Sequence, residues 1–135
     1  MKKYLGFSLI ELIFVIAIMG MLSALSIPVY TRYSVNEKRL EAKLTLNKLA
    51  AAMENYFSIH HTYLHSSLRS LGFNEKIIKN NYQLFILETS ANAFKLAAKP
   101  LKTQATRDST CGTLILYSTG EKIITGSASI RDCWE

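Results

Sequence analysis

The chain has 135 residues, of which 49% are hydrophobic and 19% are charged, so it is neither a disordered nor a low-complexity sequence. It is too short for a dinucleotide-binding enzyme or a (β/α)8-barrel enzyme. Its 16 Lys and Arg residues outnumber its 10 Asp and Glu residues, which gives a formal net charge of +6. Its two cysteines can form one disulfide but cannot supply a four-ligand zinc site alone.

Residues 7–27 form an apolar segment in which Glu11 is the one charged residue. A helix of this length spans about 30 Å, which is the thickness of the bilayer core. The short segment before it, residues 1–6, carries Lys2 and Lys3. By the positive-inside rule these lysines predict that the N-terminus stays cytoplasmic and that the rest of the chain crosses outward.

Glu11 separates three interpretations of this segment. A cleaved secretory signal and a plain membrane anchor both leave Glu11 unexplained, since a carboxylate within the membrane costs about 2.5–3.5 kcal/mol on insertion scales. A cut between Gly6 and Phe7 would instead create an α-amine at the edge of the apolar helix. The amine of one subunit could pair with Glu11 of a shifted neighbour, and this head-to-tail contact builds an open helix of subunits.

The sequence of residues 6–12, GFSLIEL, resembles the class III signal of type IV pilins and pseudopilins. The resemblance implies that a membrane-embedded prepilin peptidase cuts after Gly6 and methylates the new N-terminal Phe7. It also implies that Glu11 acts in filament assembly. The match is most specific over residues 1–30.

Gly20 and Pro28 fall where pilins of this family carry a glycine and a proline that let the N-terminal helix loosen in the filament. Both residue types are also common in membrane helices, which is the plainer explanation. Pro28 removes one backbone hydrogen bond in either case, so it weakens the helix at this point.

Residues 7–59 are expected to form one helix, about 80 Å long by its rise per residue. Beyond Pro28 an apolar stripe recurs at helical spacing, opposite a charged face, and we expect it to pack on the chain's own sheet rather than in a coiled coil. Pairs at i,i+4 between the acidic and basic residues of 37–43 are also expected. The stripe comprises Ala42, Leu46, Leu49, Met53, Tyr56, Phe57 and His60.

The rest of the chain predicts a connector, four strands and a polar loop. The connector covers residues 58–81 and the loop covers residues 102–110. The resulting fold is α+β, with one long helix packed on a four-stranded, mostly antiparallel sheet, in agreement with the pilin fold that the resemblance implies. We expect a leader at 1–6, a membrane or filament-core segment at 7–28 and a globular domain at 29–135. The strands are expected at residues 81–88, 94–99, 113–117 and 122–125.

Cys111 and Cys133 bracket the second predicted hairpin. If the domain is exported, a disulfide between them persists, although two free buried thiols are the alternative. The resemblance implies the C-terminal disulfide-bounded loop of type IV pilins, and the sequence around it is similar to PilE-type minor pilins. Trp134 is expected to be a packing anchor beside the disulfide.

The sequence offers no catalytic or cofactor motif. We find no Ser-His-Asp arrangement, no Walker motif and no Gly-x-Gly-x-x-Gly fingerprint, so no enzyme activity and no cofactor are expected. The spacing of His60, His61 and His65 does not fit a metal pair on one helix face, so no metal is expected either.

The basic residues suggest a second function. Removing the leader leaves 14 basic and 10 acidic residues and a net charge of +4. Some pilins bind DNA through basic stripes, and such binding would be weak and salt-dependent. A solvated face is the plainer interpretation. The candidate DNA-binding residues are Lys95, Lys99, Lys102 and Arg107, which could share one surface with Lys76 and Lys79.

The sequence therefore predicts a structural subunit of a type IV pilus, closest to the PilE-like minor pilins. The alternatives are a DNA-binding pilin for natural transformation and a type II secretion pseudopilin. The implied partners are other pilin subunits in a helical filament, the prepilin peptidase, the inner-membrane assembly machinery and, in the alternative, DNA. The precursor would lie in the inner membrane and the mature subunit in a cell-surface pilus of a Gram-negative bacterium.

Overall fold

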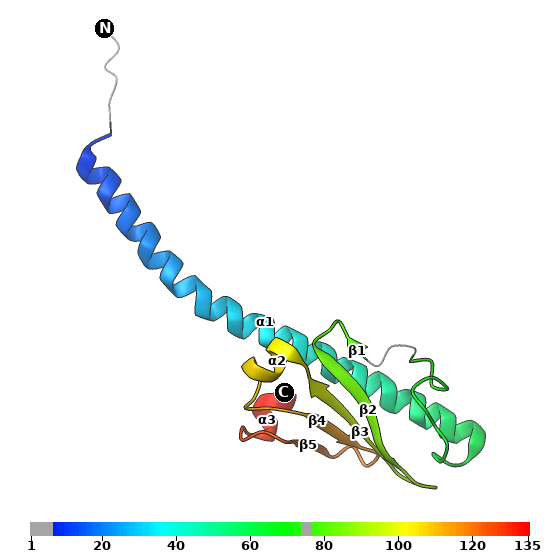
Figure 1. The fold of residues 1–135 in the computed structure, drawn as a ribbon. Helices are drawn as coiled ribbons and strands as arrows, with labels where there is room; N and C mark the ends of the chain where they lie inside the picture. Colours follow the sequence, from blue (N-terminus) through cyan, green and yellow to red (C-terminus); the bar gives the residue numbers. More distant parts are fainter. Residues whose placement is uncertain (1–6, 74–76) are drawn as a thin grey trace. The chain divides into compact units, whose positions relative to one another are not determined.

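The structure is a computed structural model that describes residues 7–73 and 77–135 (Figure 1). The expected leader, with Gly6, and the candidate DNA-binding residue Lys76 lie outside the described residues. Two compact units divide the chain, Met1–Ser34 and Val35–Glu135. The long helix α1 (Leu9–His60) contributes to both units, and each unit is described by itself below.

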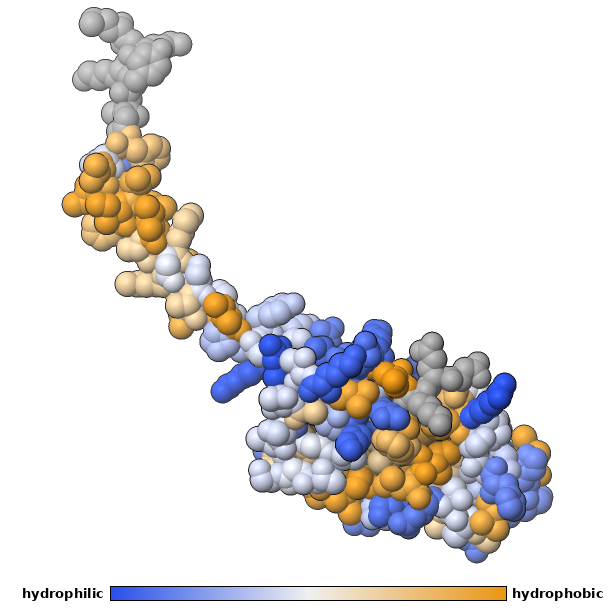
Figure 2. Space-filling model, viewed as in Figure 1, coloured by the Kyte–Doolittle hydropathy of each residue, from blue (hydrophilic) through white to orange (hydrophobic). Residues whose placement is uncertain are grey.

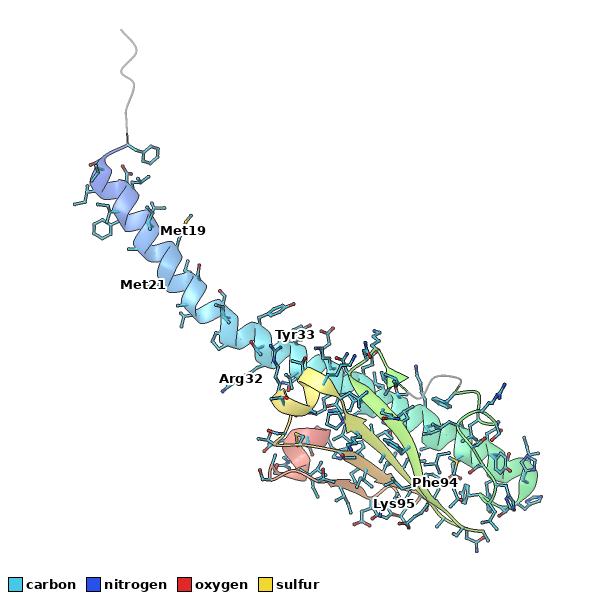
Figure 3. All side chains as sticks on the ribbon, viewed as in Figure 1. Met19, Met21, Arg32, Tyr33, Phe94 and Lys95 are labelled. Atoms are coloured by element: carbon cyan, nitrogen blue, oxygen red, sulfur yellow. A yellow bond between two sulfur atoms is a disulfide. The ribbon has the colours of Figure 1, made fainter. Side chains whose placement is uncertain are left out.

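The helix predicted over residues 7–59 is confirmed. It begins two residues later and ends one residue later than expected. In the first unit its apolar side chains, Met19 and Met21 among them, project without tertiary contacts (Figure 3). Its hydroxyl groups are satisfied inside the helix, because Ser23 and Ser26 donate to the carbonyl oxygens four residues earlier at 2.7 and 2.9 Å. By length and composition α1 could cross a membrane, a property that signal sequences share.

In the second unit α1 packs one face against the sheet. Val35, Ala42, Leu46, Leu49 and Met53 are buried, which confirms the centre of the predicted stripe. The stripe weakens at its end, where Tyr56 and Phe57 are half-buried and His60 is exposed.

In the described part of the chain the sheet has five antiparallel strands in the order β1-β2-β3-β4-β5. Four of them match the predicted strands: β2 (Tyr82–Thr89), β3 (Phe94–Pro100), β4 (Leu114–Tyr117) and β5 (Lys122–Ile124). The fifth, β1 (Ile77–Ile78), lies in the segment that the sequence predicted as a connector. It joins β2 through a tight turn in which Lys79 and Asn80 both have positive φ, and the Asn81 amide donates to the Ile78 carbonyl at 2.8 Å.

Two short helices complete the fold. The expectation of a loop over residues 102–110 is wrong for α2 (Lys102–Arg107), which begins after Leu101 without a side-chain cap. The second, α3 (Ile130–Trp134), begins at Ser129, whose hydroxyl accepts a hydrogen bond from the Asp132 amide at 3.1 Å. Polar residues dominate α2, and α3 has only five residues, so neither sequence carries much helical periodicity.

The two faces of the sheet differ in role. The face toward α1 holds the core, including the buried side chains of Leu84, Leu96 and Leu114. On the outer face one apolar row crosses four strands in register: Phe85, Ala97, Ile115 and Ile123. Hydrophobic side chains accordingly gather over the sheet in the space-filling view (Figure 2).

Candidate functional site

The N-terminal segment places Glu11 in the first turn of α1. The Ser8 carbonyl accepts hydrogen bonds from the amides of Glu11 and Leu12 at 3.0 and 3.2 Å. A carboxylate is favoured at this position, because the N-terminus of a helix carries a partial positive charge. Within the described residues Glu11 forms no ion pair, and its side chain is exposed.

The large apolar side chains of the first unit are exposed from Phe7, at 84%, to Tyr33, at 65%. Soluble monomers rarely expose apolar surface on this scale, so the surface needs a membrane or other subunits to cover it. Gly20 has open space around it, and Pro28 lies inside α1. The structure thus places Glu11, Gly20 and Pro28 on one uncovered helix, and Phe7 lies two residues before its start.

The predicted disulfide is confirmed: Cys111 and Cys133 are bonded, with their Cα atoms 5.7 Å apart. Trp134 packs beside it as expected, at 8% exposure, and its indole N–H donates to the Ile123 carbonyl at 3.2 Å. The Lys122 ammonium lies 5.4 Å from the centre of the indole ring. These contacts fasten α3 to β5.

A buried polar cluster joins α1, β2 and α2, and the sequence analysis missed it. Asp108 is fully buried and accepts hydrogen bonds from Arg39 Nε at 3.0 Å and from the Tyr82 hydroxyl at 2.6 Å. Gln104 Nε2 donates to Tyr82 and Asp108 at 3.1 and 3.2 Å. Burial and the hydrogen bond to Asp108 raise the pKa of Tyr82, and the same carboxylate raises the pKa of Arg39.

The i,i+4 pairs expected in residues 37–43 do not form, because no acidic residue there lies four positions from a basic one. The side chains find more distant partners instead. Glu41 pairs with Lys79 at 2.9 Å and Arg39 pairs with Asp108. Lys43 donates to the carbonyl oxygens of α3. Burial, followed by the nearby charges of Arg39 and Lys122, lowers the pKa of Lys43.

The candidate DNA-binding residues separate into two places. Lys99 and Lys102 are exposed near the β1–β2 turn. The Leu101 amide donates a hydrogen bond to the Asn81 carbonyl of this turn at 2.8 Å. Lys102 Nζ donates a second hydrogen bond to Asn80 Oδ1 at 3.3 Å. Arg107 is exposed at the end of α2.

Lys95 lies at the other end of β3, 3.5 Å from a carboxylate oxygen of Glu88 and 5.3 Å from the centre of the Tyr117 ring. Its labelled side chain can be followed in Figure 3. Of the candidate residues that the structure describes, Lys99 and Lys102 share the turn region with Lys79.

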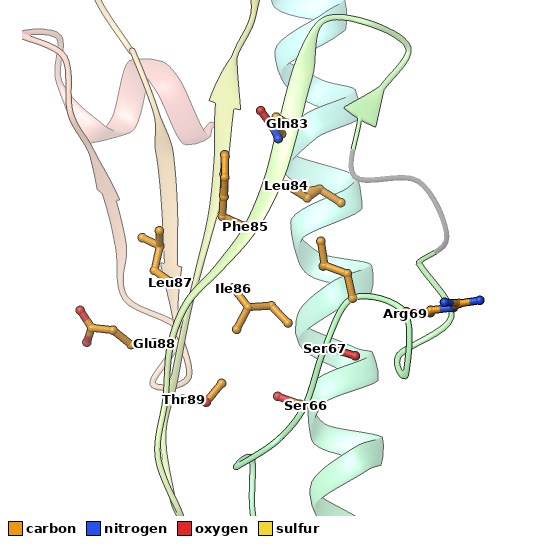
Figure 4. Close-up of a pocket in the computed structure, with 11 residues that line it drawn as sticks. Ser66, Ser67, Arg69, Gln83, Leu84, Phe85, Ile86, Leu87, Glu88 and Thr89 are labelled. Carbon is orange, nitrogen blue, oxygen red and sulfur yellow. The ribbon is translucent and has the colours of Figure 1, made fainter.

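A cavity of about 590 Å³ lies between β2 and the segment after α1 (Figure 4). Of its described lining residues, Arg69 and Glu88 are charged; Arg69 points away from β2, and Glu88 is already paired with Lys95. Among the described residues of this lining, the two charged side chains do not face each other across the cavity. The ring centres of His60 and Tyr56 lie 4.2 Å apart, with the rings tilted by 32°. The described residues contain no group of three metal-ligating side chains.

Comparison with known proteins agrees with this arrangement. The family model of the prokaryotic N-terminal methylation motif matches residues 1–27. A curated relative, the type IV major pilin protein PilA of Myxococcus xanthus (strain DK1622), is 43% identical over 53 residues. That match covers 39% of this chain and 24% of the relative, so the chain matches about a quarter of the relative's length.

A solved structure, the non-core minor pilin PilV of Neisseria meningitidis, is 19% identical, with a TM-score of 0.49 over 69% of this chain and 91% of that one. The family model described as "Type IV minor pilin ComP, DNA uptake sequence receptor" matches residues 28–115, which is more than half of the chain. The chain therefore belongs to the type IV minor pilin family.

Proposed function

We propose that a prepilin peptidase removes residues 1–6 and methylates Phe7, and that the mature chain then enters a pilus as a PilE-like minor subunit. The match to the methylation motif over residues 1–27 supports this processing. The precursor would lie in the inner membrane of a Gram-negative bacterium, with residues 29–135 outside it. The disulfide Cys111–Cys133 favours a pilin over a type II secretion pseudopilin.

The observation that carries the proposal is the isolation of Glu11. It is the one charged residue between Phe7 and Thr31, and it forms no ion pair among the described residues. A lone carboxylate in an apolar environment carries a large free-energy cost. A new α-amine on Phe7 of a neighbouring subunit would supply the opposite charge and reduce this cost. The attraction is strong where both groups leave water, so it selects one axial offset between neighbours.

Gly20 and Pro28 give this helix two weak points. Gly20 destabilises a helix by roughly 0.5–1 kcal/mol relative to alanine, and Pro28 lacks the amide that would bond one turn earlier. We propose that α1 loosens between these residues when it leaves the membrane for the filament. The inner-membrane assembly machinery would drive this step.

Substitution of Glu11 in the native host tests the proposal. Glu11→Ala should leave the leader cut intact but remove the chain from sheared pili, because the neighbour's α-amine then has no carboxylate to pair with. Glu37→Gln is the matched control, since it removes an exposed carboxylate from the same helix outside the apolar segment. Mass spectrometry of the N-terminal peptide reports N-methyl-Phe7, and immunoblots of sheared pili report incorporation. Wild-type incorporation of Glu11→Ala would refute the proposed pairing.

A second candidate function is DNA binding in natural transformation. The matching family model describes a DNA uptake sequence receptor, and Lys99 and Lys102 lie exposed beside one turn. Lys95 is a weaker candidate than the sequence suggested, because it already contacts Glu88 and Tyr117. The binding surface would then lie at the α2 end of the sheet, with Arg107 close to it in sequence.

Mobility-shift assays with duplex DNA over a range of salt concentrations test this candidate. A double variant, Lys99→Gln with Lys102→Gln, should weaken binding and reduce the slope of log K against log salt by about 2, one counterion for each phosphate that the variant no longer neutralises. Lys95→Gln is the control and should leave that slope unchanged. An unchanged slope in the double variant would show that these lysines do not bind the DNA backbone.

A further inference from the structure

The two cysteines of the disulfide are held in different ways. Cys111 follows the turn that ends α2, and its amide donates to the Asp108 carbonyl at 3.2 Å. Its own carbonyl accepts a hydrogen bond from the Gly126 amide at 3.1 Å. The turn after α2 and the segment that follows β5 therefore hold the backbone of Cys111 from its two sides, whatever the state of its thiol.

Cys133 depends instead on the docking of α3. This helix has five residues and is too short to be stable by itself. The hairpin's backbone hydrogen bonds reach Ala128, whose amide donates to the Thr110 carbonyl at 2.9 Å. Beyond that point, contacts made by α3 itself decide where the thiol of Cys133 lies.

Two cations of α1 make such contacts. Lys43 Nζ donates to the carbonyl oxygens of Trp134 and Glu135 at 3.2 and 3.3 Å. Arg39 Nη1 donates to the Asp132 carbonyl at 3.4 Å. These carbonyl groups lie at the end of a helix, where they lack partners within the helix and carry partial negative charge.

Arg39 also reaches the other cysteine's segment. It pairs with Asp108, three residues before Cys111, while it contacts Asp132, the residue before Cys133. One side chain on a long, well-packed helix thus bridges the two segments that the disulfide joins. Lys43 contacts the second segment only.

We propose that Arg39 and Lys43 are positioning residues for disulfide formation, and that they dock α3 on α1 so that Cys133 meets Cys111 before the bond forms. With glutathione disulfide as oxidant, one cysteine thiolate attacks a glutathione sulfur, forms a mixed disulfide and releases one glutathione thiolate. The other cysteine thiolate then attacks the protein sulfur of the mixed disulfide, forms the Cys111–Cys133 bond and releases the second glutathione. Two electrons pass from the cysteines to glutathione disulfide.

Docking accelerates the second step alone. That step is intramolecular, so its rate depends on how often the two sulfurs meet in the correct geometry. The first step depends on the ionisation and exposure of the attacking thiol. A nearby cation can also act by lowering the pKa of a thiol, and that effect would appear in the first step.

The experiment uses the full chain in detergent, reduced, freed of reductant and then mixed with glutathione disulfide. Samples are quenched with iodoacetamide, and mass spectrometry counts the reduced, glutathionylated and internally bridged forms. The variants are Arg39→Gln, Lys43→Gln and the control Arg131→Gln. The control removes a cation of α3 whose ion pair is with Glu135, the residue that follows this helix.

In the wild type the glutathionylated form should not accumulate. In Lys43→Gln and Arg39→Gln the second step should slow about tenfold, as expected when an intramolecular reaction loses its orientation, and the glutathionylated form should accumulate. Arg131→Gln should behave as the wild type. If Arg39→Gln does not fold, Lys43→Gln still decides the matter, because it removes contacts to α3 alone. The proposal would be overturned if the rate of the second step in Lys43→Gln were within twofold of the wild-type rate. It would also be overturned if the first step slowed instead of the second.

Discussion

The side-chain amide of Gln104 donates a hydrogen bond to the backbone carbonyl of Val35 across 3.2 Å. Val35 is the first buried residue of α1, and the described residues before it make no part of the core. Gln104 itself is only 2% exposed and lies in the same cluster as Asp108 and Arg39. The packed part of α1 therefore begins where α2 meets it, next to a buried ion pair.

That ion pair should be expensive to break. Asp108→Asn keeps the shape of the side chain but leaves the Arg39 guanidinium without its counter-ion, and we expect a loss of about 3 kcal/mol in the free energy of unfolding. Denaturant unfolding followed by circular dichroism measures this loss. Lys79→Gln, which breaks the exposed pair with Glu41, is the control and should leave the midpoint unchanged. Equal midpoints for both variants would contradict the role of the buried pair.

The same cluster predicts a loss of stability at alkaline pH. Burial and the hydrogen bond to Asp108 raise the pKa of Tyr82, so the folded state keeps the hydroxyl proton at pH values where the unfolded chain has lost it. The contribution is complete below the unfolded pKa of about 10 and is lost progressively as the pH rises above that value. Tyr82→Phe should flatten this part of the stability curve, which unfolding measurements between pH 8 and 12 would show.

Tyr63 is the internal comparison, because burial and its hydrogen bond to Glu54 also raise its pKa. Tyr63→Phe should remove its own smaller contribution and leave the contribution of Tyr82 in place. If Tyr82→Phe kept the full alkaline slope, the buried hydroxyl would not be its source.

The sequence predicted the parts of this fold that regular patterns encode. The stripe from Ala42 to Met53 has helical spacing, and the alternation in residues 94–99 identified β3, so both were found. The expectation for Trp134 as a packing anchor was also correct. For the stripe and for β3 the period of the hydrophobic residues matched the period of the element that formed.

The buried polar cluster could not be predicted in this way. Gln104 and Asp108 lie in a polar segment that reads as a loop, and their burial depends on Arg39 and Tyr82, which are distant in sequence. The charged residues of α1 suggested ion pairs within the helix instead. Contacts between i,i+4 neighbours can be inferred from the sequence of a single helix, whereas contacts to distant segments cannot. The site residues of the N-terminal segment have the opposite character, since Glu11 and Gly6 stand out in a single short motif.

Gly126 is predicted to tolerate no side chain. A Cβ at this position would overlap the Thr110 carbonyl and the backbone of Cys111, where the hairpin passes close to the disulfide. Gly126→Ala must therefore shift backbone rather than a flexible side chain, and we expect a loss of about 1–3 kcal/mol as for other overpacked sites. Thermal unfolding measures it. Ser127→Ala, at the exposed neighbouring residue, should leave the midpoint unchanged.

Reduction of the disulfide should destabilise the domain without removing its sheet. Cys111 and Cys133 are 22 residues apart, and the chain-entropy estimate for a loop of this length is about 3 kcal/mol. The double variant Cys111→Ser with Cys133→Ser should therefore unfold at a lower denaturant concentration than the oxidised chain, and at nearly the same concentration as the reduced wild type. Denaturant unfolding of the three samples provides the comparison. If the oxidised and reduced wild type had equal midpoints, the hydrogen bonds of Trp134 and Lys43 would hold α3 by themselves, and the bond would add nothing to the stability of the domain.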